Sequence, residues 1–595
     1  MILILQRPLR FARLLPAILL PLLAACATTG AVQSAAPTGG TVTVGIIGIN
    51  DFHGALVPPG QAVTASDGKG GKVLVPAGGA AWLASAVDSV RAKYSYSLTV
   101  SAGDMIGGTQ LPSALFLDEP AIGVMNRIAL DFNAIGNHEF DRGSKELLRK
   151  QTGGCRQYTT LKPCRLEQFG GARFTYLGAN AIKPDGSTLF PSTALRTFGS
   201  GKRKVKVGII GLTLAATADL SSRDGLNGIR FADEADTINA LVPGLKAKGA
   251  DAIIVLIHQG GYTKGEPDPS GCANLTGGIG PILDRLDPRI DVVISGHTHW
   301  AYVCNYADYN PAKPMLLTSA GVSGQMVTDI TIEIDPVTDK VVAKRARNVI
   351  VQSEGFMGRN GRVETTDAYP RFAPRADIQA YVGRYVDASK VEIQRPVGAL
   401  AGEVRRPGGD SSANGGTLGN LIADSQLAAT RKAGAQIALM NPFGIRSPHA
   451  IVPGPGGAVT FGQIYAVQPF TNTLVTQTLT GAELKLVLEQ GLDDNQPKQL
   501  LSVSSGFTYT YDQSRPAGSR IVAMSLDGQP IDPAGSYRVT TNNFLANGGD
   551  SFAGLAGQRD AVISAATDVE ALEAWLQGSA PRAVPVEERM VAVKP

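Results

Sequence analysis

The sequence predicts an α/β protein with at least two domains. At 595 residues, the chain is longer than a single hydrophobic core usually serves. Apolar residues make up 44% and charged residues 18%, which is typical of globular rather than disordered chains. Residues 41–350 alternate short apolar runs with helical stretches, and the pattern changes from residue 396 onward. We therefore expect a layered α/β domain followed by a smaller α+β domain.

Six apolar runs of the first domain, residues 41–350, are expected to be strands. They are Val42–Ile49, Ser97–Ser101, Phe132–Ile135, Val205–Leu212, Ala252–Ile257 and Val292–Ser295. Residues 351–395 are expected to connect the domains. Within them Gln352–Pro374 is polar and lacks periodicity, which indicates a linker, and Ala376–Ala388 is expected to form a bridging helix.

The second domain, residues 396–580, is expected to contain three helices and two strand regions. The helices are Leu418–Lys432, Thr480–Leu492 and Thr567–Gln577, and the strand regions are 459–479 and 501–511. Two of these helices begin with the spacing of a capping box, Thr480 with Glu483 and Thr567 with Glu570. Residues 581–595 are expected to be a tail.

Residues 1–25 have the features of a secretory signal peptide. Three arginines precede the apolar run Leu14–Ala25, which is too short to span a bilayer comfortably. The run ends in Leu23-Ala24-Ala25-Cys26, which resembles a bacterial lipobox. The resemblance implies cleavage before Cys26 and lipidation of its thiol. The alternative is an ordinary signal peptide with Cys26 incidental.

The segment that follows, residues 26–40, is rich in small residues and proline, which suits a flexible tether. By analogy with bacterial lipoproteins, Ala27 in place of aspartate favours the outer membrane. We therefore expect an exported chain that is lipid-anchored in the cell envelope and faces the periplasm. Removing residues 1–25 lowers the formal net charge from +4 to +1, so charge gives no reason to expect a nucleic-acid polymer as partner. No protein partner is indicated.

Four further cysteines favour disulfides, because an even number in an oxidising compartment usually pairs. They are Cys155, Cys164, Cys272 and Cys304. Proximity in sequence favours Cys155 with Cys164, which leaves Cys272 with Cys304. A metal site is the alternative, but the sequence has no Cys-x-x-Cys pair.

The expected strands of the first domain run into metal-binding residue types, and five of the chain's 6 histidines lie there. The segments are Asn50-Asp51-Phe52-His53-Gly54, Gly103-Asp104, Gly136-Asn137-His138-Glu139-Phe140-Asp141, His258 and Gly296-His297-Thr298-His299. Sites in open α/β sheets form at the carboxyl ends of strands. Each motif alone has a structural alternative, such as a turn or a hydrogen-bonded histidine. Five motifs at five strand ends predict a metal cluster of carboxylate, imidazole and amide groups.

With these motifs in this order, residues 41–350 resemble the calcineurin-like metallophosphoesterase domain of the 5′-nucleotidase family. The resemblance implies a four-layer α/β/β/α domain and two divalent metal ions, whose identity among Zn, Mn, Co, Fe and Mg stays open. The first ion would be held by Asp51, His53, Asp104 and His299, and the second by Asp104, Asn137, His258 and His297.

The resemblance also implies a catalytic pair beside the metals. His138 would stabilise the phosphoryl charge or protonate the leaving oxygen. Asp141 would orient His138 and raise its pKa through its negative charge. The alternative for His138 is a further metal ligand or a turn residue.

Residues 396–580 resemble the 5′-nucleotidase C-terminal domain in the segments Leu418–Asp424, Asn441–Arg446, Gln468–Thr473 and Asn543–Asp550. The resemblance implies that Phe470 and Phe544 enclose the nucleobase and that Asp550 accepts hydrogen bonds from the ribose. It also implies substrate contacts from Asn441, Gly444, Arg446 and one of Arg405 and Arg406. Without the resemblance, the two phenylalanines would be expected in the core.

The loop after residue 440 departs from the family pattern, because Pro442 and Phe443 stand where the family has glycines. Glycine permits backbone shapes that proline and phenylalanine do not, so we expect a reshaped loop.

The resemblance implies a metal-dependent hydrolase that releases phosphate from nucleoside 5′-monophosphates. Alternatives on the same site are 2′,3′-cyclic nucleotides and nucleotide-sugar pyrophosphates. A related sulfur-oxidation hydrolase shares the domain pair, but a stacking phenylalanine pair argues against it. A nucleotide-binding lipoprotein without activity is a further alternative, and it would be expected to lack a ligand, whereas every ligand position is filled.

Overall fold

The computed structural model describes residues 40–593, except 160, 222, 265–267, 359–360, 409–412, 447, 495–497 and 579. The expected signal peptide, Cys26 and the tether up to residue 39 lie outside the described residues. Residues 41–595 form one compact unit. Among the described residues, no helix combines the length and the apolar character needed to cross a bilayer.

Two six-stranded sheets form the first domain. The strand order of the first sheet is β16-β15-β1-β4-β5-β6, and that of the second is β13-β14-β12-β11-β9-β8. The first sheet contains β1 (Val42–Ile49), β4 (Ser97–Ser101), β5 (Phe132–Ala134), β6 (Thr175–Leu177), β15 (Met326–Asp335) and β16 (Lys340–Ile350). The second contains β8 (Thr193–Phe198), β9 (Val205–Thr213), β11 (Ala252–His258), β12 (Val292–Ser295), β13 (Ala301–Asn305) and β14 (Leu316–Ala320).

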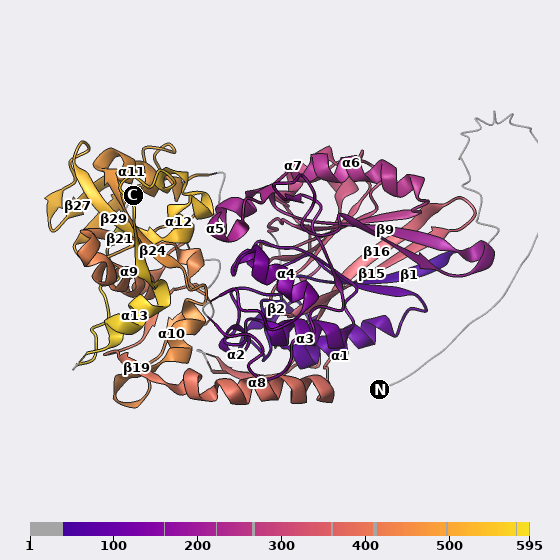
Figure 1. Cartoon of the computed structure of the whole chain (residues 1–595), viewed down its shortest axis with the longest axis horizontal. Helices are drawn as coiled ribbons and strands as arrows, with labels where there is room; N and C mark the ends of the chain where they lie inside the picture. Colours follow the sequence, from indigo (N-terminus) through magenta and orange to yellow (C-terminus); the bar gives the residue numbers. More distant parts are fainter. Residues whose placement is uncertain are drawn as a thin grey trace, which may run out of the picture. The chain divides into compact units, whose positions relative to one another are not determined.

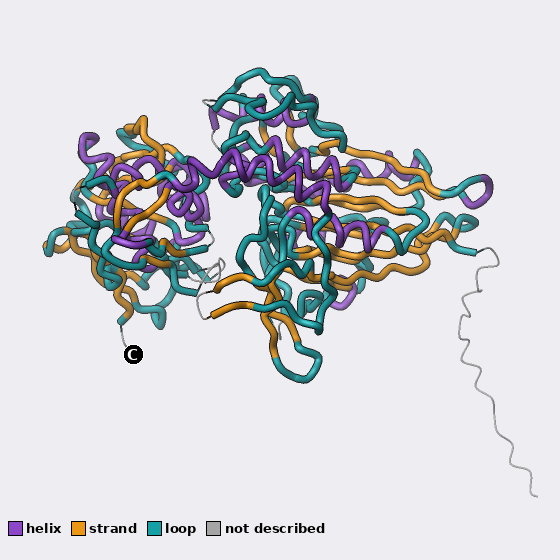
Figure 2. Tube along the Cα trace, turned by 90° about the horizontal axis from the view of Figure 1, so that it is seen from below, coloured by secondary structure: helices purple, strands orange, loops and turns teal. Residues whose placement is uncertain are grey.

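The sheets pack face to face between two layers of helices (Figures 1 and 2). Alternate residues of β1 separate the layers: Val44 and Ile46 pack between the sheets, whereas Ile47 and Ile49 face the helices. The helices on this side are α1 (Ala80–Arg91), α3 (Glu119–Ile128) and α4 (Ser144–Thr152), and those on the other side are α6 (Glu234–Ala247) and α7 (Ile279–Arg285). Both faces of the central strands are covered, which explains their continuous apolar runs and confirms the four-layer prediction.

Helix α8 (Ala376–Gln394) connects the domains, as expected, and extends six residues beyond the predicted end. Tyr381 and Tyr385 pack in the core that α1 and α3 share, and Ile393 packs against the second domain. The short helix α2 (Leu111–Ala114) of the first domain also packs in that second core. Residues 352–374 contain a hairpin, β17 (Phe356–Gly358) and β18 (Gly361–Val363), where the sequence indicated only a linker.

The second domain contains a five-stranded sheet in the order β25-β21-β29-β24-β30 and a four-stranded sheet in the order β28-β27-β26-β31. Their strands are β21 (Ile437–Met440), β24 (Thr473–Thr480), β25 (Ser502–Val503), β26 (Phe507–Tyr511), β27 (Ile521–Leu526), β28 (Gln529–Pro530), β29 (Ser536–Asn542), β30 (Val562–Thr567) and β31 (Met590–Ala592). Its helices are α9 (Gly416–Thr430), α10 (Phe461–Val467), α11 (Gly481–Gln490), α12 (Asn543–Ala546) and α13 (Asp568–Leu576). Strand β31 therefore places part of the expected tail in a sheet.

The smaller strands pair outside these sheets. They are β2 (Ala62–Ser66) with β3 (Lys72–Pro76), β7 (Ala181–Ile182) with β10 (Arg230–Phe231), β19 (Pro396–Ala399) with β23 (Ala458–Thr460), and β20 (Val404–Arg405) with β22 (Ala450–Ile451).

The prediction of a strand across 459–479 was wrong in its middle, where helix α10 lies. Thr460 and Gln463 form a complete capping box, so the local sequence starts a helix there. Buried Ile464 and Tyr465 then fix its inner face. Both predicted capping boxes, at the starts of α11 and α13, are present in full.

Candidate active site

Strand register brings the predicted ligands of the first domain together. Strands β1, β4 and β5 are parallel, with Ile49 opposite Ser101 and Ser101 opposite Asn133. In the second sheet, Ile257 lies opposite Ser295 in parallel strands. The loops after these strands therefore meet at one edge. We call the predicted ligand set there the metal edge: Asp51, His53, Asp104, Asn137, His258, His297 and His299.

One group at the metal edge gathers around Asp51. Its Oδ1 lies 3.8 Å from His53 Nε2 and 3.5 Å from His299 Nε2, and the two imidazole nitrogens are 3.1 Å apart. Ligand atoms of these three residues lie within 4.8 Å of one another, close enough to enclose one cation. Asp51 is fully buried and His53 nearly so.

A second group gathers around Asp104 and Asn137. His258 Nε2 is 3.0 Å from Asp104 Oδ2 and 3.1 Å from Asn137 Oδ1. His297 Nδ1 lies 3.1 Å from the same amide oxygen. Asp104 Oδ2 also lies 3.8 Å from His53 Nε2. The Asp104 carboxylate thus lies between the two groups.

Several residues of the metal edge share a strained, left-handed backbone conformation. Five of its residues have a positive φ: Asp51 (47°), His53 (47°), Asp104 (52°), His297 (72°) and His299 (61°). Non-glycine residues rarely adopt this region, and each costs of order 1–3 kcal/mol where the surroundings enforce it. Backbone bonds between the loops hold it, such as Asp51 N to Gly103 O at 3.0 Å. Strain concentrated at one set of side chains indicates a functional site.

Two histidines are oriented through their second ring nitrogen. His53 Nδ1 lies 2.7 Å from Gly107 O, and His258 Nδ1 lies 2.8 Å from Ala102 O. An Nδ1–H in each ring donates to the carbonyl, which turns Nε2 toward the metal edge.

The carboxylates of the metal edge are ionised at neutral pH. Burial raises the pKa of Asp104, but the positive charges of His258 and His138 outweigh burial and hold the pKa well below its usual range. For Asp51, burial is likewise outweighed by the His53 hydrogen bond and the neighbouring imidazole charges, and its pKa is lowered. Two buried carboxylates among imidazoles and an amide oxygen fit divalent cations.

Sequence reasoning missed two residues that support the metal edge. Asn50 donates to Asp51 Oδ2 at 2.8 Å and accepts from Ala320 N at 2.7 Å. The buried Glu139 carboxylate accepts from the backbone of Asp104 at 2.9 Å and from Gly136 N at 2.6 Å. Burial, and next the charge of Asp104, raise the pKa of Glu139 to about 7. Asn50 and Glu139 both lie inside the motifs that predicted the ligands, and this position was the only indication of their role in the sequence.

The two residues of the predicted catalytic pair are in contact. His138 Nδ1 lies 2.9 Å from Asp141 Oδ2, and His138 N donates to Asp104 Oδ1 at 3.0 Å. Burial lowers the pKa of His138, but the charges of Asp141 and Asp104 outweigh it, so the pKa is raised. The geometry favours a protonated imidazole.

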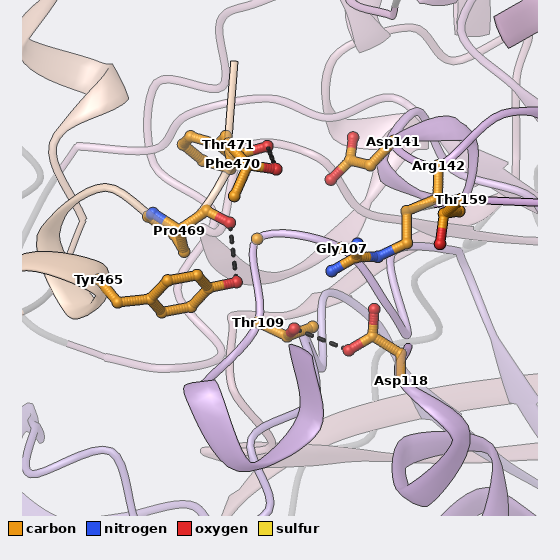
Figure 3. A pocket seen from close by; sticks show the side chains of 11 residues that line it. Gly107, Thr109, Asp118, Asp141, Arg142, Thr159, Tyr465, Pro469, Phe470 and Thr471 are labelled. Carbon is orange, nitrogen blue, oxygen red and sulfur yellow. Dashed lines mark hydrogen bonds between the residues drawn. The ribbon is translucent and has the colours of Figure 1, made fainter. Parts of the chain in front are cut away.

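Phe470 of the second domain lies against this pair. Its ring stacks on the His138 imidazole with centroids 5.4 Å apart and planes 12° apart. The Arg446 guanidinium lies 5.2 Å from the ring centroid. Figure 3 shows a cavity that Phe470 also lines, with Phe470 and Tyr465 on one side and Asp141 and Arg142 on the other. Both domains line this cavity.

Four predicted substrate residues form a cluster around the Asp550 carboxylate: Asn441, Arg406, Arg446 and Asp550 itself. Asn441 Nδ2 donates to Asp550 Oδ2 at 2.6 Å, and burial raises the pKa of Asp550 to about 6 despite the nearby charges of Arg446 and Arg406. Arg406 is buried at this cluster, whereas Arg405 is exposed. We call Asn441, Arg406, Arg446, Phe470 and Asp550, which are predicted to contact the substrate, the nucleotide face.

Gly444 and Phe544 lie at the border of this cluster. A Cβ on Gly444 would lie 2.7 Å from Asn441 Oδ1, so the glycine permits the close approach of the loop. Pro442, Phe443 and Gly444 form a 3₁₀ turn, and the Arg406 guanidinium lies 5.3 Å from the Phe443 ring centroid. Phe544 packs partly into the core of the second domain. Among the described residues, no ring contact joins it to Phe470, so an enclosed nucleobase stays a prediction.

Both cysteine pairs are bonded in the structure, Cys155 with Cys164 and Cys272 with Cys304. The first closes a loop whose residue Thr159 lines the cavity in Figure 3.

Comparisons with known proteins agree with this architecture. The family model for calcineurin-like phosphoesterases matches residues 45–301, and the model for the 5′-nucleotidase C-terminal domain matches residues 396–557. Endonuclease YhcR of Bacillus subtilis is 31% identical over 507 residues, which cover 85% of this chain and 37% of that protein. Cell wall protein Lmo0130 of Listeria monocytogenes is 28% identical over 544 residues, covering 86% of this chain and 64% of that protein. The chain thus spans less than two thirds of each of these relatives.

Among solved structures, the 5′-nucleotidase precursor from Thermus thermophilus is similar over nearly the whole chain. The TM-score is 0.68 and the sequence identity 27%, and the match covers 93% of this chain and 100% of that chain. The chain belongs to the 5′-nucleotidase family of metal-dependent phosphoesterases, in which a calcineurin-like phosphoesterase domain precedes a 5′-nucleotidase C-terminal domain.

Proposed function

We propose that the chain hydrolyses nucleoside 5′-monophosphates to nucleoside and phosphate. The contact between Phe470 and His138 carries this proposal, because it brings an aromatic side chain of the second domain to the catalytic pair of the first. A substrate with a phosphate at the metal edge and a base at the nucleotide face would engage both.

Two divalent cations would be held at the metal edge. Asp51, His53, Asp104 and His299 would hold one, and Asp104, Asn137, His258 and His297 the other. When bound, such a pair activates water and neutralises charge on a phosphoryl group. The neutral amide of Asn137 limits negative charge where an anionic substrate must approach.

The catalytic pair would act on the leaving oxygen. Asp141 accepts from His138 Nδ1–H and keeps the imidazole protonated, so that Nε2–H is available to donate to the ribose 5′-oxygen. Phe470 would fix the imidazole plane from the other domain. The ionised Asp550 carboxylate would accept a hydrogen bond from a ribose hydroxyl, and Arg446 would offset the negative charge of the nucleotide.

The test is phosphate release from adenosine 5′-monophosphate by the purified chain with Mn²⁺ or Zn²⁺. Activity that requires the metal and disappears in Asp104→Ala supports the proposal. A substrate panel with 2′,3′-cyclic nucleotides and nucleotide sugars separates it from the alternatives on the same site. Hydrolysis of a cyclic nucleotide or a nucleotide sugar with higher kcat/KM than the monophosphate would contradict it.

We also propose that Cys26 is the lipidated N-terminus of the mature chain and that the anchor places it in the outer membrane. The lipobox-like sequence and the tether after it support this. Metabolic labelling with a radioactive fatty acid should label the wild-type chain but not Cys26→Ala, and membrane fractionation should place the labelled chain with the outer membrane.

A further inference from the structure

The turn that carries Phe470 is strained. It connects α10 to β24, and Thr471 has a φ of 53°, a conformation rarely adopted by a β-branched residue. The Thr471 hydroxyl donates to the Phe470 carbonyl at 2.7 Å. Because local sequence disfavours this backbone, contacts from elsewhere must hold it.

The first such contact comes from Tyr465 on α10. Its hydroxyl donates to the Pro469 carbonyl at 3.0 Å, and the side chain is only 5% exposed. Figure 3 shows this bond on the same side of the cavity as Phe470. The hydroxyl therefore fixes the residue that precedes Phe470.

The second contact comes from Asp568, the first residue of α13, which lies 96 positions from Asn472 in the sequence. Asp568 N donates to Asn472 O at 2.8 Å, and Asn472 Nδ2 donates back to Asp568 Oδ2 at 3.2 Å. The other carboxylate oxygen accepts from Val569 N at 2.8 Å. This reciprocal pair fixes the residue two positions after Phe470.

Asp568 is an unusual choice for a purely structural position. It is 1% exposed, and no Lys, Arg or His forms an ion pair with it in the described part of the chain. Burial raises the pKa of its carboxyl to about 7, against the pull of its hydrogen-bond donors. A buried carboxyl without a cation is costly, and here the hydrogen bonds from Asn472 and Val569 offset part of that cost.

We propose that Tyr465 and Asp568 are positioning residues, which hold the Pro469–Asn472 turn so that the Phe470 ring lies at the catalytic pair. They thereby set the affinity for substrates that carry a nucleobase. This inference rests on the proposed function, since it assigns Phe470 to the base side of a nucleotide.

The test uses single-group substitutions in the full chain, with matched controls. Tyr465→Phe removes only the hydroxyl, and Asp568→Asn removes one acceptor. Tyr509→Phe removes another buried hydroxyl, which donates to Leu501 O at 3.1 Å within the second domain. Asp560→Asn changes an exposed carboxylate that accepts from Thr478.

For each variant, KM and kcat are measured with adenosine 5′-monophosphate and with ribose 5-phosphate, which lacks the base. Tyr465→Phe and Asp568→Asn should raise KM for the nucleotide about three- to tenfold, the range of one lost hydrogen bond. KM for ribose 5-phosphate should stay within about twofold. In a Phe470→Ala background neither substitution should raise KM further, because both act through that ring.

Equal increases in KM for both substrates, additive effects in the Phe470→Ala background, or the same increase in Tyr509→Phe or Asp560→Asn would overturn the inference. Crystal structures of the two variants give a readout independent of activity. The Phe470 ring should leave its stack on His138 while the metal edge is unchanged, and an unmoved ring would contradict the inference. Should the wild-type chain cleave neither substrate, the proposed function fails, and these structures still decide the positioning role.

Discussion

The metal edge and the nucleotide face differ in how their side chains are fixed. The ligands of the metal edge follow strands whose register places them, and the strained backbone conformations of Asp51 and Asp104 are enforced by neighbouring loops. The nucleotide face stands on turns and short helices, and Phe470 depends on side chains that come from α10 and α13. The proposed metal ligands thus follow strands of the sheets, whereas the proposed substrate contacts lie mainly on loops, which vary more readily. Substitutions at the metal edge should therefore reduce catalysis of every substrate, whereas substitutions at the nucleotide face should change the KM for nucleotides.

The largest effect is expected at the bridging position. Asp104→Asn should lower kcat/KM for adenosine 5′-monophosphate by about 10³-fold or more, because it removes a charge that both cations would share. Steady-state kinetics at saturating Mn²⁺ measures this. Asp236→Asn, at an exposed ion pair with Arg285, is the matched control and should stay near wild type. A loss below tenfold in Asp104→Asn would show that the two groups do not act as one site.

The next effect concerns pH. Asp141→Asn should lower kcat about 10–100-fold, since His138 loses the group that orients it. The Asp141 charge raises the pKa of His138, so its removal lowers that pKa. The protonated form is then lost at lower pH, and the alkaline limb of the kcat–pH profile should shift to lower pH. A profile that keeps its alkaline limb would exclude His138 as the proton donor.

A smaller effect is expected at the nucleotide face. Phe470→Ala should raise KM for adenosine 5′-monophosphate about tenfold, the value of one aromatic stack, and should change KM for ribose 5-phosphate less. Phe443→Ala, at the neighbouring turn, tests whether the departure from the family pattern narrows the site. Equal loss on both substrates in Phe470→Ala would mean that the ring acts only on His138.

The smallest effect is expected from a substitution that lowers only the stability of the fold. Thr480→Ala removes the capping box of α11, which lies away from both regions, and should lower the free energy of unfolding by about 1 kcal/mol. Urea denaturation measures this loss, and kcat and KM should not change. A change in KM would show that the second domain transmits local stability to the nucleotide face.

The sequence predicted the positions of functional side chains best where they directly follow a strand. Each predicted ligand lies at or just after a strand end, because parallel strands in register must end at one edge. The capping boxes of α11 and α13 were also predicted, since their hydrogen bonds span three residues, whereas the one at α10 was not.

Contacts between distant segments could not be predicted in the same way. Three features depend on packing between segments that are far apart in the sequence. They are the stack of Phe470 on His138, the burial of Arg406 rather than Arg405, and the pairing of Asp568 with Asn472. Helix α10 was missed because Phe461–Val467 is short and apolar, and short apolar runs do not separate strand from helix.

The most direct test of the account is the metal content of the purified chain, because every catalytic assignment depends on cations at the metal edge. Elemental analysis after dialysis should find two divalent cations per wild-type chain, and fewer in Asp104→Asn and His297→Ala. A wild-type chain that binds no cation yet releases phosphate from adenosine 5′-monophosphate would contradict it.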